Sequence, residues 1–510
     1  MASEQPQGTP PERTTTPPRD RAPQGRASGD RVPRDRASQD PAPGDRAAAD
    51  RAPHDGARGD GAPRDAAPEP SHAYLDQLRR DTEGRKGELA HHLADHRGAA
   101  QELHERLESL VDAQAQGLTR VLHLLHENPE TAFQEHRAAA WIVEYLAAHD
   151  IAAQSPVHGL DTAVRAELES EDFDPGRHRT IAVMSEYDAL PGIGHGCGHN
   201  VIAVTGLGAF VALVELLRED PRAFSGRVVY LGTPAEEGEG GKEIMARAGA
   251  LEGVDAAAMV HSYPVDLVDQ VWLGRRQCEV RFHGRASHAS SHPFLGRNAL
   301  DAAVLAYQGL GLLRQQTPPT DRIHAVLPEG GERPNIITEE ATLRLYVRSQ
   351  RPETLGTLST RVTEVMEGAA LMAGVGVTVA WDTSPATLPV LGNGPLSDRW
   401  VLAQRRRDRE PYPAGTVSEV LAASTDFGNV SYRVPGIHPL IGLADEDTGL
   451  HSREFAAAAA TPAAEKAGLD GAYGLAAVAL DYLTDDDLAH DVAEDFRANG
   501  GGISVPDYFA

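Results

Sequence analysis

The sequence predicts an α/β fold in which a mostly parallel sheet, flanked by helices, is interrupted by a smaller α+β module. Two observations support this fold class. Short continuous apolar runs recur between helical segments, as expected for parallel strands that are buried on both faces. Between the third and the fourth of these runs lies a block whose strands and helices follow a different order.

Four apolar runs are the predicted strands of the main sheet. They are TIAVMS at 180–185, GRVVYLGT at 226–233, AAAMVHS at 256–262 and GIHPLIGL at 436–443. The segments before and between them carry apolar residues at three- and four-residue spacing, which is the period of a helix face. This spacing predicts helices over 102–129, 136–150 and 200–219.

The block from 271 to 384 has the order strand, helix, strand, strand, helix, strand. This is the order of a ferredoxin-like α+β module. Because the apolar runs of the main sheet resume after it, we interpret the block as an insertion. The chain is therefore divided into a main domain in two parts, 71–270 and 385–498, the inserted module, 271–384, and a C-terminal tail, 499–510.

Residues 1–70 are predicted to be a disordered tail. From residue 21 the chain repeats a ten-residue pattern rich in Pro, Arg, Asp and Ala, as in RAPQGRASGD and RVPRDRASQD. The pattern contains almost no large apolar side chain. Such a segment cannot bury enough apolar surface to offset the entropy lost on ordering.

Charge and cysteine content limit which binding partners and which cellular compartment are expected for the protein. The 510 residues include 75 acidic side chains against 48 Lys and Arg, a formal net charge of −27. Nucleic acid and anionic membranes would be repelled, so neither is expected as a partner. The chain has only two cysteines, begins without an apolar signal segment, and has no run near the ~20 apolar residues of a membrane span. We therefore expect a cytoplasmic protein.

Each predicted strand of the main sheet is followed by side chains that bind metals. These are Cys197 and His199 after the first run, Glu236 and Glu237 after the second, His261 at the end of the third and His451 after the fourth. In open α/β sheets the functional crevice lies beyond the carboxyl ends of the strands. Thiolate, imidazole and carboxylate are the ligands of zinc, and the last two also serve manganese. The pattern predicts a metal site at one edge of the sheet.

Six motifs along the chain resemble, in order and spacing, those of the dinuclear metallopeptidases of family M20, which includes aminoacylases, carboxypeptidases and hippurate hydrolases. They are EYDALPGIGHGCGHN, GTPAEEGEGGK, VHSYP, HGRASHASSHP, GGERPNIIT and STDFGNVSYRVPGIHP. Within the family they look most like the amidohydrolase branch that contains Xaa-Arg dipeptidases and p-aminobenzoyl-glutamate hydrolases. The resemblance extends over residues 72–498.

The resemblance implies roles for the residues at the strand ends. Those that match metal ligands of this branch are Cys197, His199, Glu237, His261 and His451. The implied cofactor is a pair of divalent metal ions, zinc or manganese, with cobalt as a further candidate. Glu236 matches the general base, which takes a proton from water and passes it to the leaving amine.

The resemblance also implies that the inserted module is a lid through which two chains form a homodimer. His288 matches a lid histidine that reaches the partner's active site and stabilises the oxyanion. Asn335 and Arg348 match residues that hold a substrate carboxylate, the arginine by a bidentate fork. The alternative interpretation of Arg348 is an arginine on a solvated strand face, and packing is the simpler interpretation for His324 and His438.

The implied function is metal-dependent hydrolysis of the amide bond of small substrates with a free carboxylate. These are dipeptides, with a basic C-terminal residue among the candidates, or N-acyl amino acids; an aryl amide such as p-aminobenzoyl-glutamate is the alternative. A cysteine amidase using Cys197 is disfavoured because His195 and His199 lie only two residues away on a glycine turn. A catalytically silent scaffold is disfavoured because Glu236 stands beside a full ligand set.

Overall fold

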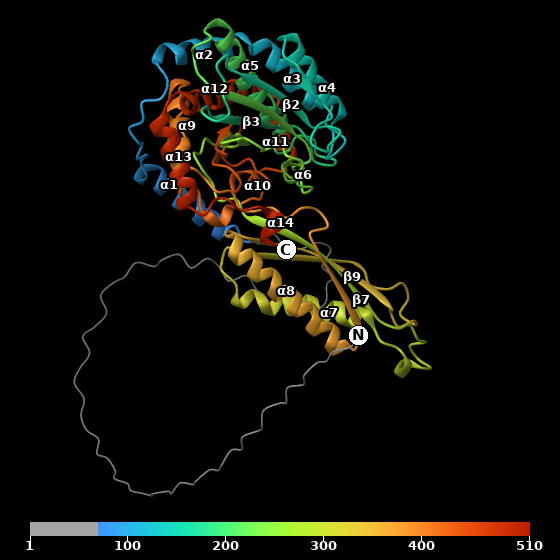
Figure 1. Cartoon of the computed structure of the whole chain (residues 1–510). Helices are drawn as coiled ribbons and strands as arrows, with labels where there is room; N and C mark the ends of the chain where they lie inside the picture. Colours follow the sequence, from blue (N-terminus) through green and yellow to red (C-terminus); the bar gives the residue numbers. More distant parts are fainter. Residues whose placement is uncertain (1–69, 510) are drawn as a thin grey trace, which may run out of the picture. The chain divides into compact units, whose positions relative to one another are not determined.

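The computed structural model describes residues 70–509, so the predicted disorder of 1–70 falls almost wholly outside the described residues. The principal sheet has the strand order β1-β2-β4-β3-β5-β11 (Figure 1). Its strands are β1 (Ala153–Gln154), β2 (Val164–Glu169), β3 (Thr180–Glu186), β4 (Arg227–Thr233), β5 (Ala256–Ala258) and β11 (Gly436–Ile437). From β4 to β11 the pairs are parallel, and β1 and β2 add an antiparallel edge. This confirms the predicted fold class.

The central strands consist of apolar residues on both faces because both faces are covered by other elements. Every residue of β3 is buried, and so is every residue of β4 after Arg227. The register places Glu186, the last residue of β3, opposite Thr233, the last residue of β4. The segments that follow these strands therefore start from the same edge of the sheet.

Helices pack around this sheet and enclose the main core (Figure 1). They are α2 (Gln101–Ala113), α3 (Ala115–Glu127), α4 (His136–Ala148), α5 (His199–Glu219), α9 (Gly394–Arg406), α11 (Arg453–Ala458), α12 (Pro462–Thr484) and α13 (Asp486–Ala498). Two short helices, α6 (Gly241–Arg247) and α10 (Gly428–Ser431), belong to a second, smaller core, and α1 (Ala73–Glu88) buries only Leu78. Helix α5 is long and apolar enough to cross a membrane by composition, but 94% of that stretch is buried inside the protein against α12 and its neighbours. It is the core helix of the domain.

The structure differs from the sequence prediction at three places. The single helix predicted over 102–129 is two helices, α2 and α3, which meet at Gln114. The side-chain amide of Gln114 is buried and donates to the carbonyls of Leu110 and Gly208, which fixes the junction against α5. The runs predicted as the third and fourth strands each divide, because the chain leaves the principal sheet after β5 and β11 and forms a separate parallel pair, β6 (His261–Tyr263) and β12 (Leu440–Gly442).

A second sheet of four antiparallel strands, in the order β10-β7-β9-β8, is formed by residues 274–381. Its elements are β7 (Gly274–His283), α7 (Ala299–Leu313), β8 (Arg322–Glu329), β9 (Glu340–Ser349), α8 (Pro352–Ala373) and β10 (Gly376–Trp381). They enclose a hydrophobic core of their own. We call residues 274–381 the module. Cys278 lies in its core, whereas Cys197 lies beside the principal sheet, and neither forms a disulfide.

Two short stretches of chain join the module to the rest of the described residues. They run side by side, because the backbones of Arg275 and Thr387 exchange two hydrogen bonds of 2.8 Å. The tail predicted from residue 499 packs back onto the protein: the amides of Gly502 and Ile503 donate to the carbonyl of Tyr432, and α14 (Val505–Tyr508) buries Val505.

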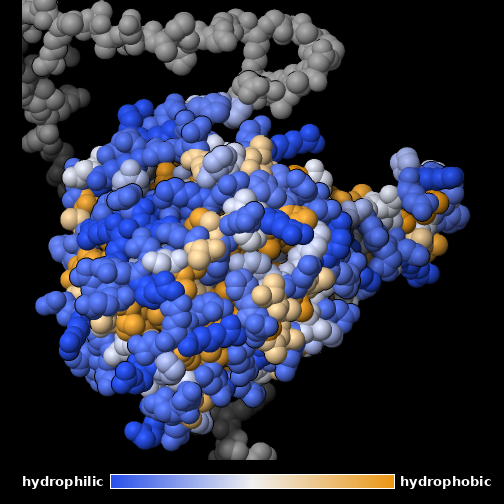
Figure 2. Space-filling view, turned by 90° about the horizontal axis from the view of Figure 1, so that it is seen from above, coloured by the Kyte–Doolittle hydropathy of each residue, from blue (hydrophilic) through white to orange (hydrophobic). Residues whose placement is uncertain are grey.

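The face in Figure 2 is mainly hydrophilic, with apolar residues in scattered groups. A mainly polar surface agrees with the acidic composition of the chain.

Candidate active site

The side chains that follow the parallel strands meet at one place. Three overlapping groups offer ligand atoms that lie within 4.8 Å of one another: Cys197, His199 and His261; Cys197, Glu237 and His451; and His199, Glu236 and Glu237. Together they contain every residue predicted as a metal ligand and the predicted general base. We call these six residues the ligand cluster.

Two atoms of the ligand cluster lack the hydrogen bonds that buried polar atoms normally make. His199 Nε2 lies 3.9 Å from Glu236 Oε2 and 4.0 Å from Glu237 Oε1, and His451 Nε2 lies 3.7 Å from the same Glu237 oxygen. Within the described residues, neither His199 Nε2 nor Glu237 Oε1 has a hydrogen-bond partner. These two atoms lie 4.0 Å apart without a hydrogen bond, which is an arrangement that a cation between them would satisfy.

The glycines of the first motif allow this geometry. Gly198, at the start of α5, has a φ of 70°, which a residue with a side chain rarely adopts. A Cβ there would lie 2.7 Å from the Cβ of Ser262, whose hydroxyl donates to the Gly198 carbonyl at 3.0 Å. Only glycine lets the chain pass so close to β6, and this approach sets Cys197 and His199 on either side of the turn.

Asp188 orients two members of the ligand cluster, His199 and Glu237, through its two carboxylate oxygens. Its Oδ1 lies 3.0 Å from His199 Nδ1, and its Oδ2 accepts the backbone amide of Glu237 at 2.9 Å. Burial disfavours a charged imidazole, but the Asp188 carboxylate outweighs burial and raises the pKa of His199 well above its usual range. A carboxylate on Nδ1 leaves Nε2 directed to the cluster, as is typical of metal-binding histidines.

The electrostatics of the ligand cluster favour a bound cation. Glu236 is 8% exposed, and burial, followed by the nearby carboxylates of Glu186, Glu237 and Asp426, raises its pKa well above the usual range. Burial also raises the pKa of the Cys197 thiol. A divalent cation would lower both pKa values by stabilising the negative forms. A raised thiol pKa is also the opposite of what a nucleophilic cysteine requires, which argues against a cysteine amidase.

Sequence reasoning missed a buried ion network next to the ligand cluster. The Lys242 ammonium is completely buried, donates to Asp426 Oδ1 at 2.6 Å, and forms a second short contact with Glu186. A close approach of backbones brings it there, because a Cβ on the preceding Gly241 would lie 1.8 Å from the Pro234 carbonyl oxygen. All three charged residues belong to motifs of the chain, but nothing in those motifs indicates that the residues pair.

A cavity of about 490 Å³ opens onto the ligand cluster. Arg348 lines it from the module, as expected of a residue that holds substrate. His288 and Asn335 do not line it: both are exposed, and they lie beside each other on the module, where the Ala289 amide donates to the Asn335 carbonyl at 3.0 Å. Of the three residues predicted to contact substrate from the module, the structure brings Arg348 alone to the cavity of its own chain.

The remaining histidines of the motifs have different surroundings. His438 stacks on Phe427 at 4.8 Å between ring centroids and is buried. His195 is buried with Nε2 3.1 Å from the Leu125 carbonyl. His324 lines the same cavity as Arg348, so the interpretation as a packing residue does not describe its position.

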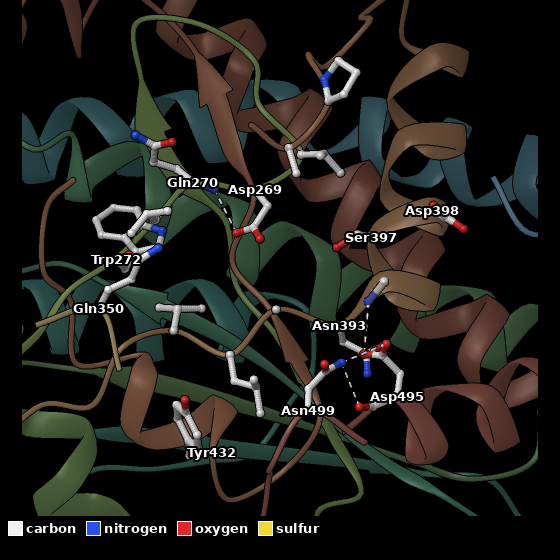
Figure 3. Close-up of a pocket in the computed structure, with 18 of the residues that line it drawn as sticks. Asp269, Gln270, Trp272, Gln350, Asn393, Ser397, Asp398, Tyr432, Asp495 and Asn499 are labelled. Carbon is white, nitrogen blue, oxygen red and sulfur yellow. Dashed lines mark hydrogen bonds between the residues drawn. The ribbon is translucent and has the colours of Figure 1, made fainter. Parts of the chain in front are cut away.

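A larger cavity of about 750 Å³ shares Trp272 with the first (Figure 3). Two of its carboxylates accept hydrogen bonds from neighbouring groups: Asp269 from the backbone amide of Gln270 at 2.8 Å, and Asp495 from the Asn499 side chain at 3.1 Å. No group of potential metal ligands found among residues 70–509 lies in this cavity. The smaller cavity is therefore the candidate active site.

The sequence profile of peptidase family M20/M25/M40 matches residues 182–496, which include the whole ligand cluster. The chain belongs to this peptidase family. Membership confirms the family that the motifs indicate, and it makes the protein a metal-dependent hydrolase. In an M20 enzyme, the gathering of thiol, imidazole and carboxylate groups at the strand ends is the expected position of the active site.

Individual relatives resemble this M20 enzyme over most of their length. The Xaa-Arg dipeptidase of Mus musculus is 35% identical over 399 residues, which are 78% of this chain and 92% of the relative. One of the polypeptides of the p-aminobenzoyl-glutamate hydrolase of Escherichia coli is 27% identical, over 78% of this chain and 95% of its own length. A dinuclear metal-binding M20 peptidase of Bacillus subtilis has the same fold, with a TM-score of 0.55 at 21% identity over 73% of this chain and 99% of its own.

Proposed function

We propose that this M20 enzyme hydrolyses the amide bond of small substrates with a free carboxylate, either dipeptides or N-acyl amino acids. The observation that carries the proposal is the ligand cluster, whose unpartnered atoms face one another beside a cavity of substrate size. The relatives support the substrate class, because the names Xaa-Arg dipeptidase and p-aminobenzoyl-glutamate hydrolase both describe cleavage of an amide next to an amino acid.

Two divalent cations fit the ligand cluster. The residues that would hold them are Cys197, His199, Glu237, His261 and His451. The thiol favours zinc over manganese or cobalt, because a soft ligand prefers a softer metal. When bound, such cations supply Lewis acidity that activates water and polarises the scissile carbonyl.

Side chains of the protein carry out proton transfer and hold the substrate. Glu236 is the cluster carboxylate left for proton transfer: it takes the proton of the attacking water and delivers it to the leaving nitrogen. Arg348 holds the substrate carboxylate at the far side of the cavity.

Changing a proposed ligand should remove metal. Cys197→Ser and His199→Ala are each expected to lower the metal content of the purified enzyme, since each deletes a donor of the ligand cluster. Elemental analysis by mass spectrometry measures the content directly. The matched control is Cys278→Ser, which changes the other cysteine, in the core of the module, and should leave metal content unchanged. A metal-free preparation with full activity would contradict the proposed cofactor.

We also propose a homodimer formed through the module. The large apolar side chains that are exposed gather there: all but Tyr74, Leu89 and Leu421, within residues 70–509, belong to the module or its loops. They are Phe294, Leu295, Val304, Tyr307, Leu312, Val326, Leu327, Ile336, Leu371 and Met372. Exposed apolar surface of this kind is typical of an interface. A second copy seated there would offer its own His288 and Asn335, which do not line the cavity of their own chain.

Subunit mixing tests the shared site. Glu236→Gln and His288→Ala should each be nearly inactive as pure dimers. In a mixed dimer, the chain that keeps Glu236 receives an intact His288 from its partner, so one of the two sites is complete. Random re-pairing should restore roughly a quarter of wild-type activity, because half of the dimers are mixed and each has one complete site. Chains with different tags verify the exchange, and a well-exchanged mixture that stays inactive would rule out a shared site.

The cysteine content supports a cytoplasmic location for the enzyme, and the net charge indicates its class of partner. The two free cysteines suit a reducing compartment. The net charge of −27 favours small-molecule substrates over nucleic acid or membranes as partners.

A further inference from the structure

Three arginines stand in a row across neighbouring strands of the module. Arg348 of β9 is paired in register with Arg275 of β7 on one side and with Arg322 of β8 on the other. Like charges directly opposite each other destabilise a sheet. No ion pair within residues 70–509 includes any of the three; Arg275 donates to the Gly238 carbonyl and Arg322 to the carbonyls of Pro319 and Asp321.

The side chains of the arginine row are buried or partly buried, and two of them contact an aromatic ring. Two of the guanidinium groups lie close to the ring of Tyr346, that of Arg275 at 5.0 Å and that of Arg348 at 5.3 Å from its centroid. Arg275 is only 7% exposed. Burial, together with the charge of Arg275, lowers the pKa of Arg348, although arginine stays protonated under ordinary conditions. The row therefore keeps its positive charge, and no carboxylate in the described part of the chain pairs with it.

The arginine row lines the same cavity as the ligand cluster. Its lining includes residues of the ligand cluster together with Arg275, Arg322, Arg348 and His324. Arg275 lies nearest the cluster, because it donates to the carbonyl of Gly238, next to Glu237. A bidentate fork lets one guanidinium take up one carboxylate. Three guanidinium groups therefore exceed what a single carboxylate of a substrate requires.

Resting on the proposed function, we propose that the preferred substrates release an acidic amino acid, such as glutamate or aspartate, so that two carboxylates of the substrate face the arginine row. Arg348 holds the α-carboxylate, while Arg275 and Arg322 hold the carboxylate of the side chain. A basic side chain would face the same guanidinium groups. The carboxylates that line the cavity are those of Glu236 and Glu237, in the ligand cluster, and Asp426, which is bound to Lys242.

Matched dipeptides test the proposal on the metal-loaded enzyme. Ala-Glu should have a kcat/KM roughly tenfold or more above that of Ala-Gln, which has the same shape without the charge. Ala-Arg should be the poorest of the set. If Ala-Arg or Ala-Gln is cleaved as well as Ala-Glu, the acidic preference is wrong while the proposed amide hydrolase stands.

Variants of the arginine row assign the preference to it. Arg322→Gln should raise KM for Ala-Glu roughly tenfold and leave Ala-Gln within about twofold, because it removes one charge-assisted contact to the side-chain carboxylate. Arg275→Gln should act in the same direction, although Arg275 also supports the turn at Gly238. The control is Arg344→Gln on β9, the strand of Arg348. Arg344 is exposed and paired with Glu279, so its change should alter kcat/KM for neither dipeptide. Equal losses for both dipeptides in Arg322→Gln would contradict the assignment.

A binding measurement keeps the proposal testable if no dipeptide is cleaved, an outcome that would overturn the proposed dipeptidase activity alone. Calorimetric titration of the metal-loaded Glu236→Gln variant with N-acetyl-glutamate and N-acetyl-glutamine should give roughly tenfold tighter binding of the glutamate derivative. Equal affinities would overturn the acidic preference.

Discussion

The Glu236→Gln variant is expected to keep its metal and to bind substrate, while kcat falls by roughly 10²-fold or more. Glutamine has nearly the same shape as glutamate but cannot accept the proton of the attacking water. Glu237, the neighbouring proposed ligand, is unchanged, so the ligand cluster should still hold cations. Elemental analysis, calorimetric binding of substrate and steady-state kinetics measure the three quantities separately.

Glu239→Gln is the matched control for this variant. Glu239 lies three residues further along the same turn, is exposed, and accepts a hydrogen bond from the Ser384 hydroxyl at 2.9 Å. Its change should leave kcat within about twofold, since surface substitutions have small effects. If Glu236→Gln turned over substrate at the wild-type rate with metal bound, another group would have to carry the proton.

The Lys242→Met variant is expected to lower the free energy of unfolding by roughly 3–5 kcal/mol. Among residues 70–509, the ammonium is the only lysine or arginine group within 4.0 Å of the Glu186 and Asp426 carboxylates, and all three groups are buried. Methionine fills a similar volume but leaves both carboxylates without compensation. Burial already raises the pKa of Asp426 to about 6, which shows how costly its charge is there. Chemical denaturation measures the loss.

Lys466→Met separates this effect from the general effect of replacing a lysine. The Lys466 side chain is 59% exposed, and its partner Asp470 is also bound by Arg407 and Arg409. Its loss should change the free energy of unfolding by no more than about 1 kcal/mol. Similar losses in both variants would show that the buried network contributes no more than an exposed pair.

The fold was predictable where one physical constraint determines one element. The runs at 180–185 and 226–233 are apolar on both faces because helices cover both, and each became a single buried strand. The runs at 256–262 and 436–443 were predicted as single strands, and each divides between two sheets. An apolar run reports burial, but it does not report which sheet buries each half.

The candidate site was predictable to the extent that its residues follow strands of known direction. Cys197 and Glu237 meet because β3 and β4 are parallel and end together. Lys242 and Asp426 lie 184 residues apart in the chain, and their pairing depends on packing that no local pattern records. The arginine row depends on strand register, since a shift of one residue would place these side chains on the other face of the sheet.

The chain enters and leaves the module through two short stretches, which are joined by the backbones of Arg275 and Thr387. The sequence of the module is therefore one continuous segment. The residues proposed to bind metal and to transfer the proton are encoded outside residues 274–381, and the arginines proposed to select the substrate are encoded inside them, in a segment with its own core. Mutations within this one continuous segment of the gene can therefore change which substrates the enzyme prefers. The segments on either side, which encode the ligand cluster, remain unaltered.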